Sequence, residues 1–471
     1  MMPDRDQVIS GLAALIGASH VITDDAMMAP YLTDWRKRYS GRALCVVRPS
    51  TTEEVIAVMR FAKAHALAIV PQGGNTGLVG GSVPLGRGDE IVLSFQRLNR
   101  IRTIDPSSDT VIVEAGATLA ALQDKAEEVG RLFPLSLASE GTATVGGAIA
   151  TNAGGTAALT YGTMRDLVLG LEIVLPDGTL LNTLTTLRKD NTGYHPASLF
   201  MGAEGTLGVI TAASLKLFPL PRARHAGFCG VKSPREALKL FHHLKNNAGP
   251  SLTTFELMPR FAIEIALTHI TGLRDPLSEP HEWYVMPEFS FFDSDDAHEK
   301  AALWLSAAIE LGLVDDAVIS ESLSQRDAFW AIRESIPEAQ VREGPSIKHD
   351  ISVPIAEIPD FIERVCTEIV EDLPGIRPCV FGHVGDGNLH FNLQAPKNMD
   401  EASYANHAER LHALVYRHVV ARKGSVSAEH GIGQVKRAQL AATKDPHVLA
   451  MMRQIKAVID PEGRMNPGKV L

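Results

Sequence analysis

Cysteine is scarce in this chain, and the few cysteines do not form a recognisable framework. The four residues, with no C-x-x-C pair among them, are Cys45, Cys229, Cys366 and Cys379. A disulfide-stapled secreted domain has a much higher density of cysteine, so this class of protein is excluded. The scarcity is typical of a protein that works in a reducing compartment.

Long apolar runs and a secretory leader are also missing. Residues 167–175 come closest to a membrane span, but Glu172 interrupts them and the run is far too short. The N-terminus, MMPDRDQVISGLAAL, lacks the basic segment followed by an apolar segment that marks a signal peptide. We therefore expect a soluble, cytoplasmic protein without a transmembrane segment.

Four common functional motifs are absent as well. G-x-G-x-x-G, G-x-x-x-x-G-K-[ST], H-E-x-x-H and G-x-S-x-G do not occur. The nearest segment, GIGQVK at residues 431–436, lacks the third glycine and a preceding strand. A Rossmann NAD site and a P-loop are therefore excluded, and the commonest signatures of metalloproteases and serine hydrolases are missing.

Positive charge is in the minority. The sequence has 45 Lys and Arg against 55 Asp and Glu, a formal net charge of −10. This balance speaks against nucleic acid and anionic membrane surfaces as main partners. With 471 residues, of which 45% are hydrophobic, the chain can build a large core. Its length corresponds to about three domains or large lobes.

The pattern of elements changes along the chain. In the first half, the spacing of apolar residues predicts short strands near 67–71, 110–114 and 169–175 and helices near 51–66 and 119–129. After Pro219-Leu220-Pro221, it predicts strands near 285–292 and 380–384 and longer helices near 234–246, 296–311, 358–372 and 401–423, with a last helix after Pro446. This is an α+β pattern.

Glycine is concentrated in three segments of the first half. They are PQGGNTGLVGGS (71–82), EGTATVGGAIATNAGG (140–155) and GAEGTLGVIT (202–211). Glycine lets the backbone approach a ligand closely, and successive N–H groups can then surround an anion. Each segment by itself could be only a set of tight turns. Their grouping favours a large cofactor whose pyrophosphate is bound by the main chain.

A strong local signal is GHVGDGNLHFN at residues 382–392. Asp386-Gly387 is a preferred two-residue hairpin turn, which would pair His383 directly with His390 on one face. Two imidazoles at that spacing suit one divalent metal ion. The alternative is two buried or solvent-facing histidines, and the pairing that the turn enforces favours the metal.

A third ligand is needed, and SAEHGIG (427–433) offers Glu429 and His430. Neighbouring side chains usually diverge, so one of them could bind the metal while the other faces a substrate. Two histidines and a carboxylate leave positions open for a substrate oxygen. His407, His412 and His418 have spacings that do not make one ligand face, and we expect them to be structural or solvated.

These segments, in this order, resemble the FAD-dependent dehydrogenases of the vanillyl-alcohol oxidase/p-cresol methylhydroxylase superfamily. The resemblance is closest to their D-2-hydroxyglutarate and D-lactate dehydrogenase branch, and it runs from about Tyr31 to the C-terminus. Further segments that carry it are LRKDNTGY (187–194) and DPEGRMNPGK (460–469).

The resemblance implies an α+β fold in three parts. Residues 1–219, with a core of about 40–218, would form a two-part FAD-binding domain of the p-cresol methylhydroxylase type. Residues 220–424 would form an α+β cap, or substrate domain, with an antiparallel sheet that carries the metal hairpin. Residues 425–471 would return to the flavin and complete the FAD and metal sites.

The resemblance also implies a cofactor site. FAD would be bound by the glycine segments, with the first loop on its pyrophosphate, and by the C-terminal tail through one asparagine. The residues that would contact it are Pro71, Gly73, Gly74, Asn75, Thr76, Gly77, Gly80, Gly81, Ser82, Gly141, Gly147, Thr151, Asn152, Gly154, Gly155, Ile210 and Asn466.

By the same resemblance, His383, His390 and Glu429 would bind zinc or a similar divalent ion. His430 would be the catalytic base, Asn392 would touch the substrate, and Arg333 and Lys348 would bind its carboxylates. The expected reaction is oxidation of a D-2-hydroxy acid to the 2-keto acid. The metal would favour the alkoxide, and hydride would pass to flavin N5. D-2-hydroxyglutarate is the favoured substrate.

Two residues depart from the family pattern. Asn75 stands where some members carry a histidine linked to the flavin, so we expect non-covalent FAD. Pro337 stands where the 2-hydroxyglutarate enzymes have a hydroxyl-bearing residue, which keeps D-lactate, or another short D-2-hydroxy acid such as D-malate, as an alternative substrate. A flavin-free metal-dependent hydrolase and a non-catalytic binding protein are alternatives of other classes. We expect an electron-transfer flavoprotein or a quinone as electron acceptor, and a homodimer is possible.

Overall fold

A computed structural model describes residues 4–293 and 295–471, which form two compact units. The first unit contains the residues up to 155, residues 161–220 and residues 429–471. The second unit contains residues 156–160 and 221–428. Neither unit is continuous in the sequence, because the chain leaves the first unit and returns to it.

The first unit contains a small sheet in the order β1 (Val21–Ile22), β2 (Val46–Val47), β4 (Glu90–Ser94) and β3 (Ala68–Gln72). Strands β2, β3 and β4 run parallel. Helix α3 (Thr52–Ala64) connects β2 to β3, and the Thr51 side chain caps its N-terminus by accepting a hydrogen bond from Glu54 N. The glycine-rich loop starts directly after β3.

A second sheet of the first unit is antiparallel. Its strands follow the order β5 (Ile101–Asp105), β6 (Thr110–Glu114), β10 (Val209–Lys216), β8 (Val168–Val174) and β9 (Leu180–Asn182). Every residue of β8 is buried. Helix α4 (Leu119–Glu128) begins after the loop that follows β6, and helix α5 (Val145–Thr151) lies within the second glycine segment.

Other helices and strands complete the first part of the chain. They are α1 (Arg5–Ile16), η1 (Ala18–His20), α2 (Asp25–Leu32), β7 (Arg131–Leu132), α6 (Ala158–Tyr161), α7 (Met164–Leu167), η2 (Pro196–Leu199) and β11 (Phe218–Pro219).

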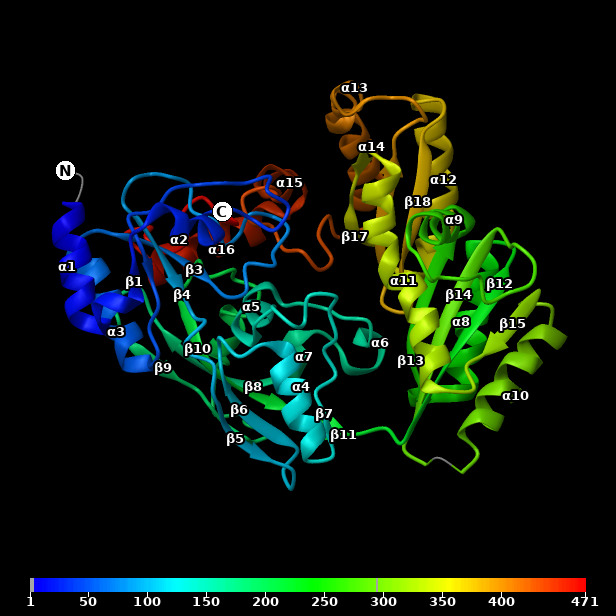
Figure 1. Ribbon diagram of the computed structural model, residues 1–471, viewed down its shortest axis with the longest axis horizontal. Coiled ribbons are helices and arrows are strands. Elements are labelled where there is room, and N and C mark those ends of the chain that lie inside the picture. Colours follow the sequence, from blue (N-terminus) through cyan, green and yellow to red (C-terminus); the bar gives the residue numbers. More distant parts are fainter. Residues whose placement is uncertain (1–3, 294) are drawn as a thin grey trace. The chain divides into compact units, whose positions relative to one another are not determined.

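The C-terminal segment, with helices α15 (Arg437–Thr443) and α16 (Pro446–Ile459), folds back onto the first unit. Figure 1 shows it in red beside β3 and β4. Met465 forms a parallel bridge with Ile69, and Asn466 N donates to Ile69 O at 2.8 Å. The buried Asn466 side chain donates from Nδ2 to Gly81 O (2.9 Å) and Glu204 O (2.7 Å). One asparagine therefore connects two of the glycine segments.

The second unit is built on one antiparallel sheet. Its order is β15 (Asp316–Ile319), β12 (Ala223–Val231), β14 (Trp283–Phe291), β13 (Leu252–Pro259), β18 (Arg377–His383), β19 (Asn388–Gln394) and β16 (Ser346–Ile347), and β17 (Asp350–Ser352) also pairs with β19. This sheet confirms the antiparallel α+β architecture expected for the second half.

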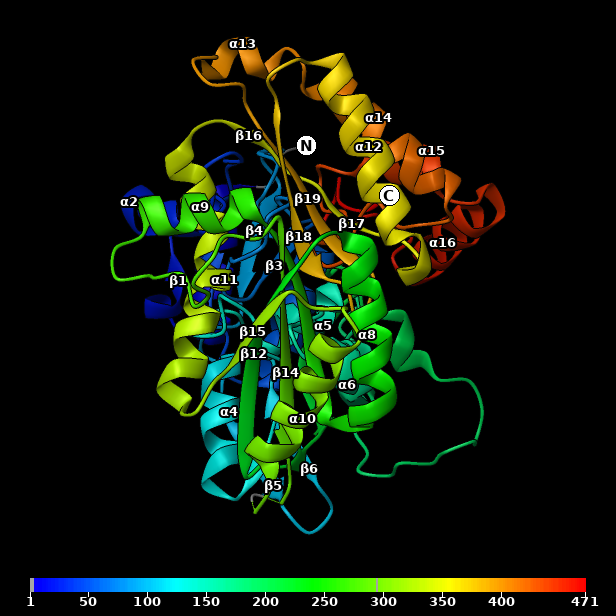
Figure 2. The same ribbon diagram turned by 90° about the vertical axis from the view of Figure 1, so that its right-hand side faces the viewer.

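The two faces of this sheet differ in chemistry. In β13, Phe255 and Leu257 face one side and join a core with α8 (Pro234–Ala248), α10 (Ala297–Glu310), α12 (Ile358–Asp372) and α14 (Ala408–Ala421). Glu256 and Met258 face the other side, which α9 (Arg260–His269) and α11 (Leu323–Glu343) cover. Figure 2 shows α9 and α11 on one side of β12 and β14 and α8 on the other. The second face carries most of the buried polar side chains that matter below.

Most of the predicted elements are confirmed, but one predicted helix is divided and several observed elements, α11 among them, were not predicted. The helix predicted over residues 401–423 is two helices, α13 (Glu401–Ala405) and α14, because Asn406 and His407 interrupt it. Helix α11 was missed. It is the longest helix, and Pro337 lies inside it, although proline usually ends a helix because it lacks the N–H group. The remaining short helices of the second unit are η3 (Gly249–Ser251) and η4 (Ile355–Glu357).

Among the described residues, no helix is both long and apolar enough to cross a membrane.

We predict that Asn466→Ala destabilises the first unit. The change leaves the half-buried Gly81 carbonyl and the buried Glu204 carbonyl without their donor, which costs about 2–4 kcal/mol of unfolding free energy. Urea denaturation followed by circular dichroism measures this cost. The control is Asn191→Ala in an exposed loop, for which we expect a change within about 0.5 kcal/mol. Equal stabilities of the two variants would contradict the prediction.

Candidate functional site

Two adjoining pockets open in the first unit beside the first glycine loop. One, of about 260 Å³, is lined by Gly74, Gln96, Asn99, Gly116, Ala117, Thr118, Ala121, Gly141, Thr142 and Thr144. The other, of about 420 Å³, is lined by Ile22, Met27, Pro30, Tyr31, Arg48, Gln72, Gly74, Asn75 and Gln96. They share Gly74 and Gln96, so the loop after β3 borders both.

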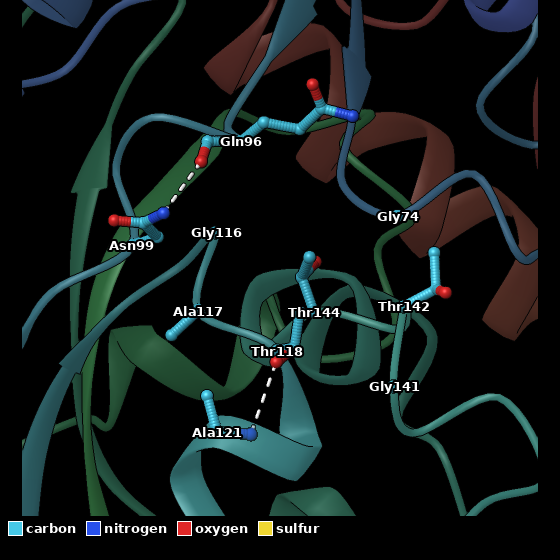
Figure 3. A pocket seen from close by; sticks show the side chains of 10 residues that line it. All are labelled: Gly74, Gln96, Asn99, Gly116, Ala117, Thr118, Ala121, Gly141, Thr142 and Thr144. Carbon is cyan, nitrogen blue, oxygen red and sulfur yellow. Dashed lines mark hydrogen bonds between the residues drawn. The ribbon is translucent and has the colours of Figure 1, made fainter.

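The first pocket lies at the start of two helices. Thr118 caps α4 by accepting from Ala121 N, and Thr144 caps α5 by accepting from Gly147 N, each at 3.2 Å. Figure 3 shows Gly116 and Ala117 on one side of the pocket and Gly74 and Thr142 on the other. The N-terminus of a helix such as α4 carries partial positive charge and N–H groups that bind anions. The pocket therefore suits a phosphate-containing ligand.

Two of the lining glycines are required by close packing. A Cβ atom on Gly74 would lie 1.9 Å from Thr142 O, and one on Gly116 would lie 1.8 Å from Phe95 O. Any side chain at these positions would push the two loops apart. Gly77 and Gly141 have open space instead, so their backbone is accessible to a ligand.

The seventeen residues predicted to bind FAD all lie in the first unit, but they do different things. Gly74, Asn75 and Gly141 line the pockets. Several others support the loops: Ser82 Oγ donates to Asn75 Oδ1, Thr151 Oγ1 donates to Gly147 O, and Asn152 Oδ1 accepts from Arg165 N. Ile210 is packed in the core on β10. Direct contact of these supporting residues with a cofactor remains a prediction.

The other residues of that set also belong to the packed loops. Gly73 lies against the Thr144 side chain, Gly155 against Ser136 O, and Gly80 against Gln434 of the returning segment. Pro71 lies in β3, directly before the loop. Thr76, Gly81 and Gly154 lie in the same glycine segments.

Glu204, in the third glycine segment, anchors the SAEHGIG segment to the first unit. Its carboxylate accepts from Ile432 N at 2.7 Å and from Gly433 N at 2.8 Å. Burial raises the pKa of Glu204, and these N–H groups act in the opposite direction. Within this unit the Glu429 carboxylate lies 3.8 Å from the position of a Cβ atom on Gly154. Glu429 is thus held beside the second glycine segment.

The hairpin in the second unit differs from the predicted register. Phe381 pairs with His390, and Cys379 pairs with Asn392, so His383 does not lie directly opposite His390. The turn spans residues 384–387 rather than Asp386-Gly387 alone, and Gly387 N donates to His383 O at 3.1 Å. The predicted direct pairing is therefore wrong by two residues. A shift of two keeps both side chains on the same face of the sheet.

The two histidines are still neighbours. Their ring centroids lie 5.8 Å apart at an interplanar angle of 75°. His383 is buried and His390 is half-buried. His383 Nδ1 is 2.5 Å from Glu256 Oε1. A carboxylate that holds the second nitrogen of an imidazole is the usual support of a metal-binding histidine. The pair therefore fits a divalent metal ion.

Arg333, on α11, lies next to the same carboxylate. Its Nε donates to Glu256 Oε2 at 2.7 Å, and its guanidinium lies over the Phe381 ring at 4.8 Å. Burial would raise the pKa of Glu256, but His383 and Arg333 outweigh it and lower that pKa to about 2. Arg333 is 6% exposed. Within residues 4–293 and 295–471, only its Nε has a hydrogen-bond partner, so its terminal amino groups can serve a carboxylate ligand.

Lys348 lies between β16 and β17, and Asn392 lies in β19, which pairs with both strands. Burial raises the pKa of the Cys379 thiol to about 12, while Lys348, Arg333 and Arg377 act to lower it, which places these cations near β18. Asn392 is buried: its Nδ2 donates to Gln340 Oε1 at 2.8 Å, and its Oδ1 accepts from His349 N at 3.3 Å. Both the Nδ2 and the Oδ1 atom of Asn392 are therefore already engaged in hydrogen bonds within the protein.

Glu429 and His430 follow directly on the last residue of the second unit, Ala428. Ser425 forms two backbone hydrogen bonds with Ser352 of β17, and Ala428 N donates to Asp350 O at 3.4 Å. Asp350, in turn, pairs in register with His390. The chain is therefore bound to the second unit up to the residue before Glu429.

The sequence did not identify several of these residues as functional. Glu256 and Asp350 come from strands far from the hairpin in sequence, and no spacing rule connects them to it. Thr118 could have been found, because it follows a small-residue segment and begins the helix predicted near 119–129. Thr144 begins α5, which the sequence did not predict.

Lys469, in the C-terminal segment, is a buried cation of the first unit. It is 2% exposed, and its Nζ has no hydrogen-bond partner among the described residues. Burial lowers the pKa of Lys469 to about 8, although Glu90 and Glu204 act to raise it. The folded chain therefore loses this proton at a lower pH than an exposed lysine does.

Two family models match the chain. One described as FAD linked oxidases, C-terminal domain, matches residues 220–470, and one described as FAD binding domain matches residues 43–184. The chain is 36% identical over 463 residues to the mitochondrial D-2-hydroxyglutarate dehydrogenase of Arabidopsis thaliana, covering 98% of this chain and 81% of that protein. The mitochondrial D-2-hydroxyglutarate dehydrogenase of Bos taurus is 39% identical, covering 98% and 83%.

The fold is similar to that of p-cresol methylhydroxylase solved with substrate bound. The TM-score is 0.75 at 16% identity, and the match covers 99% of this chain and 96% of that one. At this identity the likeness concerns the fold, and it confirms the α+β fold of the p-cresol methylhydroxylase type.

We predict that the stability of the chain rises with pH through the titration of Lys469. Between about 8 and its ordinary value of 10.5, the unfolded chain keeps the Lys469 proton and the folded chain has lost it, so the unfolding free energy increases with pH. Lys469→Met should remove this increase and stabilise the chain at pH 7. The measurement is urea denaturation from pH 7 to 10.5, with exposed Lys444→Met as control. If the unfolding free energy of Lys469→Met rose with pH as steeply as that of the wild type, the prediction would be wrong.

Proposed function

The chain belongs to the FAD-linked oxidases, and on this premise we propose that it oxidises D-2-hydroxyglutarate to 2-oxoglutarate. The observation that carries the proposal lies in the second unit. There, a buried arginine suited to a carboxylate and a histidine suited to a metal bind opposite oxygens of one glutamate. The FAD-binding match speaks against a flavin-free hydrolase, and these groups speak against a protein without catalysis.

The first unit fits FAD. The pockets beside the glycine loop combine accessible main chain with the N-terminus of α4, which suits a pyrophosphate. Asn75 has no nucleophilic atom for a flavin linkage, and its side chain donates to Pro30 O and Thr33 O. We therefore propose that FAD is bound non-covalently. When bound, it supplies the two-electron oxidant of the reaction.

A divalent metal ion fits the histidine pair. Its donors would be His383, His390 and Glu429, two nitrogens and one carboxylate, a set that suits zinc. The two histidines support this set within the second unit, where their ring centroids lie 5.8 Å apart. When bound, the metal supplies a Lewis acid that makes a hydroxyl group more acidic.

The chain's own side chains would bind the substrate and move its proton. Arg333 would hold a carboxylate through its two terminal amino groups, and Lys348 would hold the second carboxylate as a point charge. An imidazole nitrogen of His430 would accept the proton of the C2 hydroxyl. One N–H group of Asn392 is bonded to Gln340, and its Oδ1 accepts one hydrogen bond from His349. Asn392 would therefore contact the substrate through its second N–H group or the second lone pair of Oδ1.

One observation favours a shorter substrate. Pro337 lies on α11 one turn beyond Arg333 and offers no hydroxyl or N–H group. A D-2-hydroxy acid without a distal carboxylate, such as D-lactate, would not need a donor there. D-malate, which is one carbon shorter than D-2-hydroxyglutarate, lies between the two cases.

The other expectations stay predictions. The electron acceptor is predicted to be an electron-transfer flavoprotein or a quinone, and a homodimer is possible. A cytoplasmic location is also a prediction, and the names of the two relatives place those proteins in mitochondria.

Anaerobic bleaching of the bound flavin tests the proposed function. We expect D-2-hydroxyglutarate to bleach the visible flavin absorbance and its L-enantiomer to leave it unchanged. We also expect kcat/KM for D-2-hydroxyglutarate to exceed that for D-lactate by at least about tenfold, because Arg333 and Lys348 offer two cations. A higher value for D-lactate would establish the alternative, and purified protein that takes up no FAD would contradict both.

Metal removal gives an independent test of the histidine pair. Dialysis against a chelator should abolish bleaching by substrate, and added Zn²⁺ should restore it. His383→Ala and His390→Ala should each lower zinc affinity by more than the roughly 10–100-fold that loss of a supporting residue costs. Affinity is measured by competition with a chromophoric chelator. His242→Ala, on the exposed side of α8, is the control, and variants with the affinity of this control would remove the assignment.

A further inference from the structure

Glu256 is the most deeply buried carboxylate of the second unit's polar face. It is 0% exposed, and it pairs in register with His383 across β13 and β18. Its two oxygens have different partners: Oε2 accepts from Arg333 Nε at 2.7 Å, and Oε1 lies 2.5 Å from His383 Nδ1. No motif in the sequence singles it out.

The chemistry of the carboxylate decides where His383 carries its proton. Glu256 forms an ion pair with Arg333, whose Nε lies 2.7 Å from Oε2, and a carboxylate in an ion pair can only accept hydrogen bonds. His383 Nδ1 must therefore carry the hydrogen. In the neutral ring the other nitrogen, Nε2, then carries the lone pair that binds a metal ion.

We propose that Glu256 is the positioning residue of this site, which fixes the tautomer and ring orientation of His383 and the direction of Arg333 with one carboxylate. The inference rests on the proposed function for its purpose, because it assigns how the metal ligand and the carboxylate-binding arginine are held in one geometry. Both oxygens of Glu256 are engaged by Arg333 and His383, so it acts through these two residues.

Glu288 provides an internal comparison. It lies on the neighbouring strand β14, on the same face, and it is 6% exposed. Its Oε2 accepts from Arg326 Nε at 2.7 Å and from Trp330 Nε1 at 2.6 Å, both on α11. Glu288 thus joins the sheet to the same helix as Glu256 does, but without a histidine. The histidine contact is what distinguishes Glu256 from a purely structural carboxylate.

Glu256→Gln separates the two roles, because it keeps the size of the side chain. Its amide oxygen can still accept from Arg333 Nε, so its NH₂ group then points to His383 Nδ1 and requires a lone pair there. The proton of His383 must move to Nε2, the nitrogen that the metal needs. We expect zinc affinity to fall by about 10–100-fold, the usual cost of losing such a support.

The experiment combines chelator competition with ¹⁵N NMR of the histidine-labelled full-length protein. The His383 signals are assigned by their absence in His383→Ala. In metal-free wild type, Nδ1 should carry the proton, and in Glu256→Gln, Nε2 should carry it. Glu256→Asp keeps two acceptor oxygens, so it should retain the wild-type tautomer and recover part of the zinc affinity.

Glu288→Gln is the matched control. It removes an equivalent buried charge beside the same helix, and it should leave both the His383 tautomer and zinc affinity unchanged. An unchanged tautomer in Glu256→Gln, or an equal loss of zinc affinity in Glu256→Gln and Glu288→Gln, would overturn the inference. Wild-type protein that binds no zinc would instead overturn the proposed metal site, and the tautomer comparison, which needs no metal, would then decide the role of Glu256 by itself.

Discussion

A carboxylate buried in an apolar layer is tolerated only where cationic or donor groups surround it, and this constraint organises the second unit. Glu256 is fully enclosed, so α11 must bring Arg333 to it, and the sheet must place His383 beside it. The requirement is met by three segments that are distant in sequence. The positions of Arg333 and His383 in the candidate site therefore follow from the need to stabilise the buried charge of Glu256.

The first unit also contains a buried carboxylate, Glu204, whose partners lie in the returning C-terminal segment. Glu204 is buried, and the N–H groups of Ile432 and Gly433 satisfy its carboxylate, while Asn466 satisfies its carbonyl. Backbone donors are effective partners for a buried carboxylate because they are already held in position. The same contacts keep Glu429 and His430, a few residues earlier, in a defined place in this unit.

The hairpin shows why two side chains can be predicted as neighbours from an incorrect register. The two-residue turn at Asp386-Gly387 would have placed His383 opposite His390, but the turn has four residues and Phe381 takes that place. Side chains in a strand alternate with a period of two, so an error of two residues leaves both histidines on the same face. An error of one residue would have separated them.

The sequence by itself determined the α+β pattern, several of the helices and strands, the glycine segments and the histidine pair. These follow from short-range rules: hydrophobic spacing, capping residues and turn chemistry act over a few residues. Only the tertiary structure decided that Glu256 supports both His383 and Arg333, that the Asn392 amide is engaged by Gln340 and His349, and that α11 continues through Pro337. Those outcomes depend on which distant segments pack together, because a buried polar group takes whichever partner the packed core places beside it.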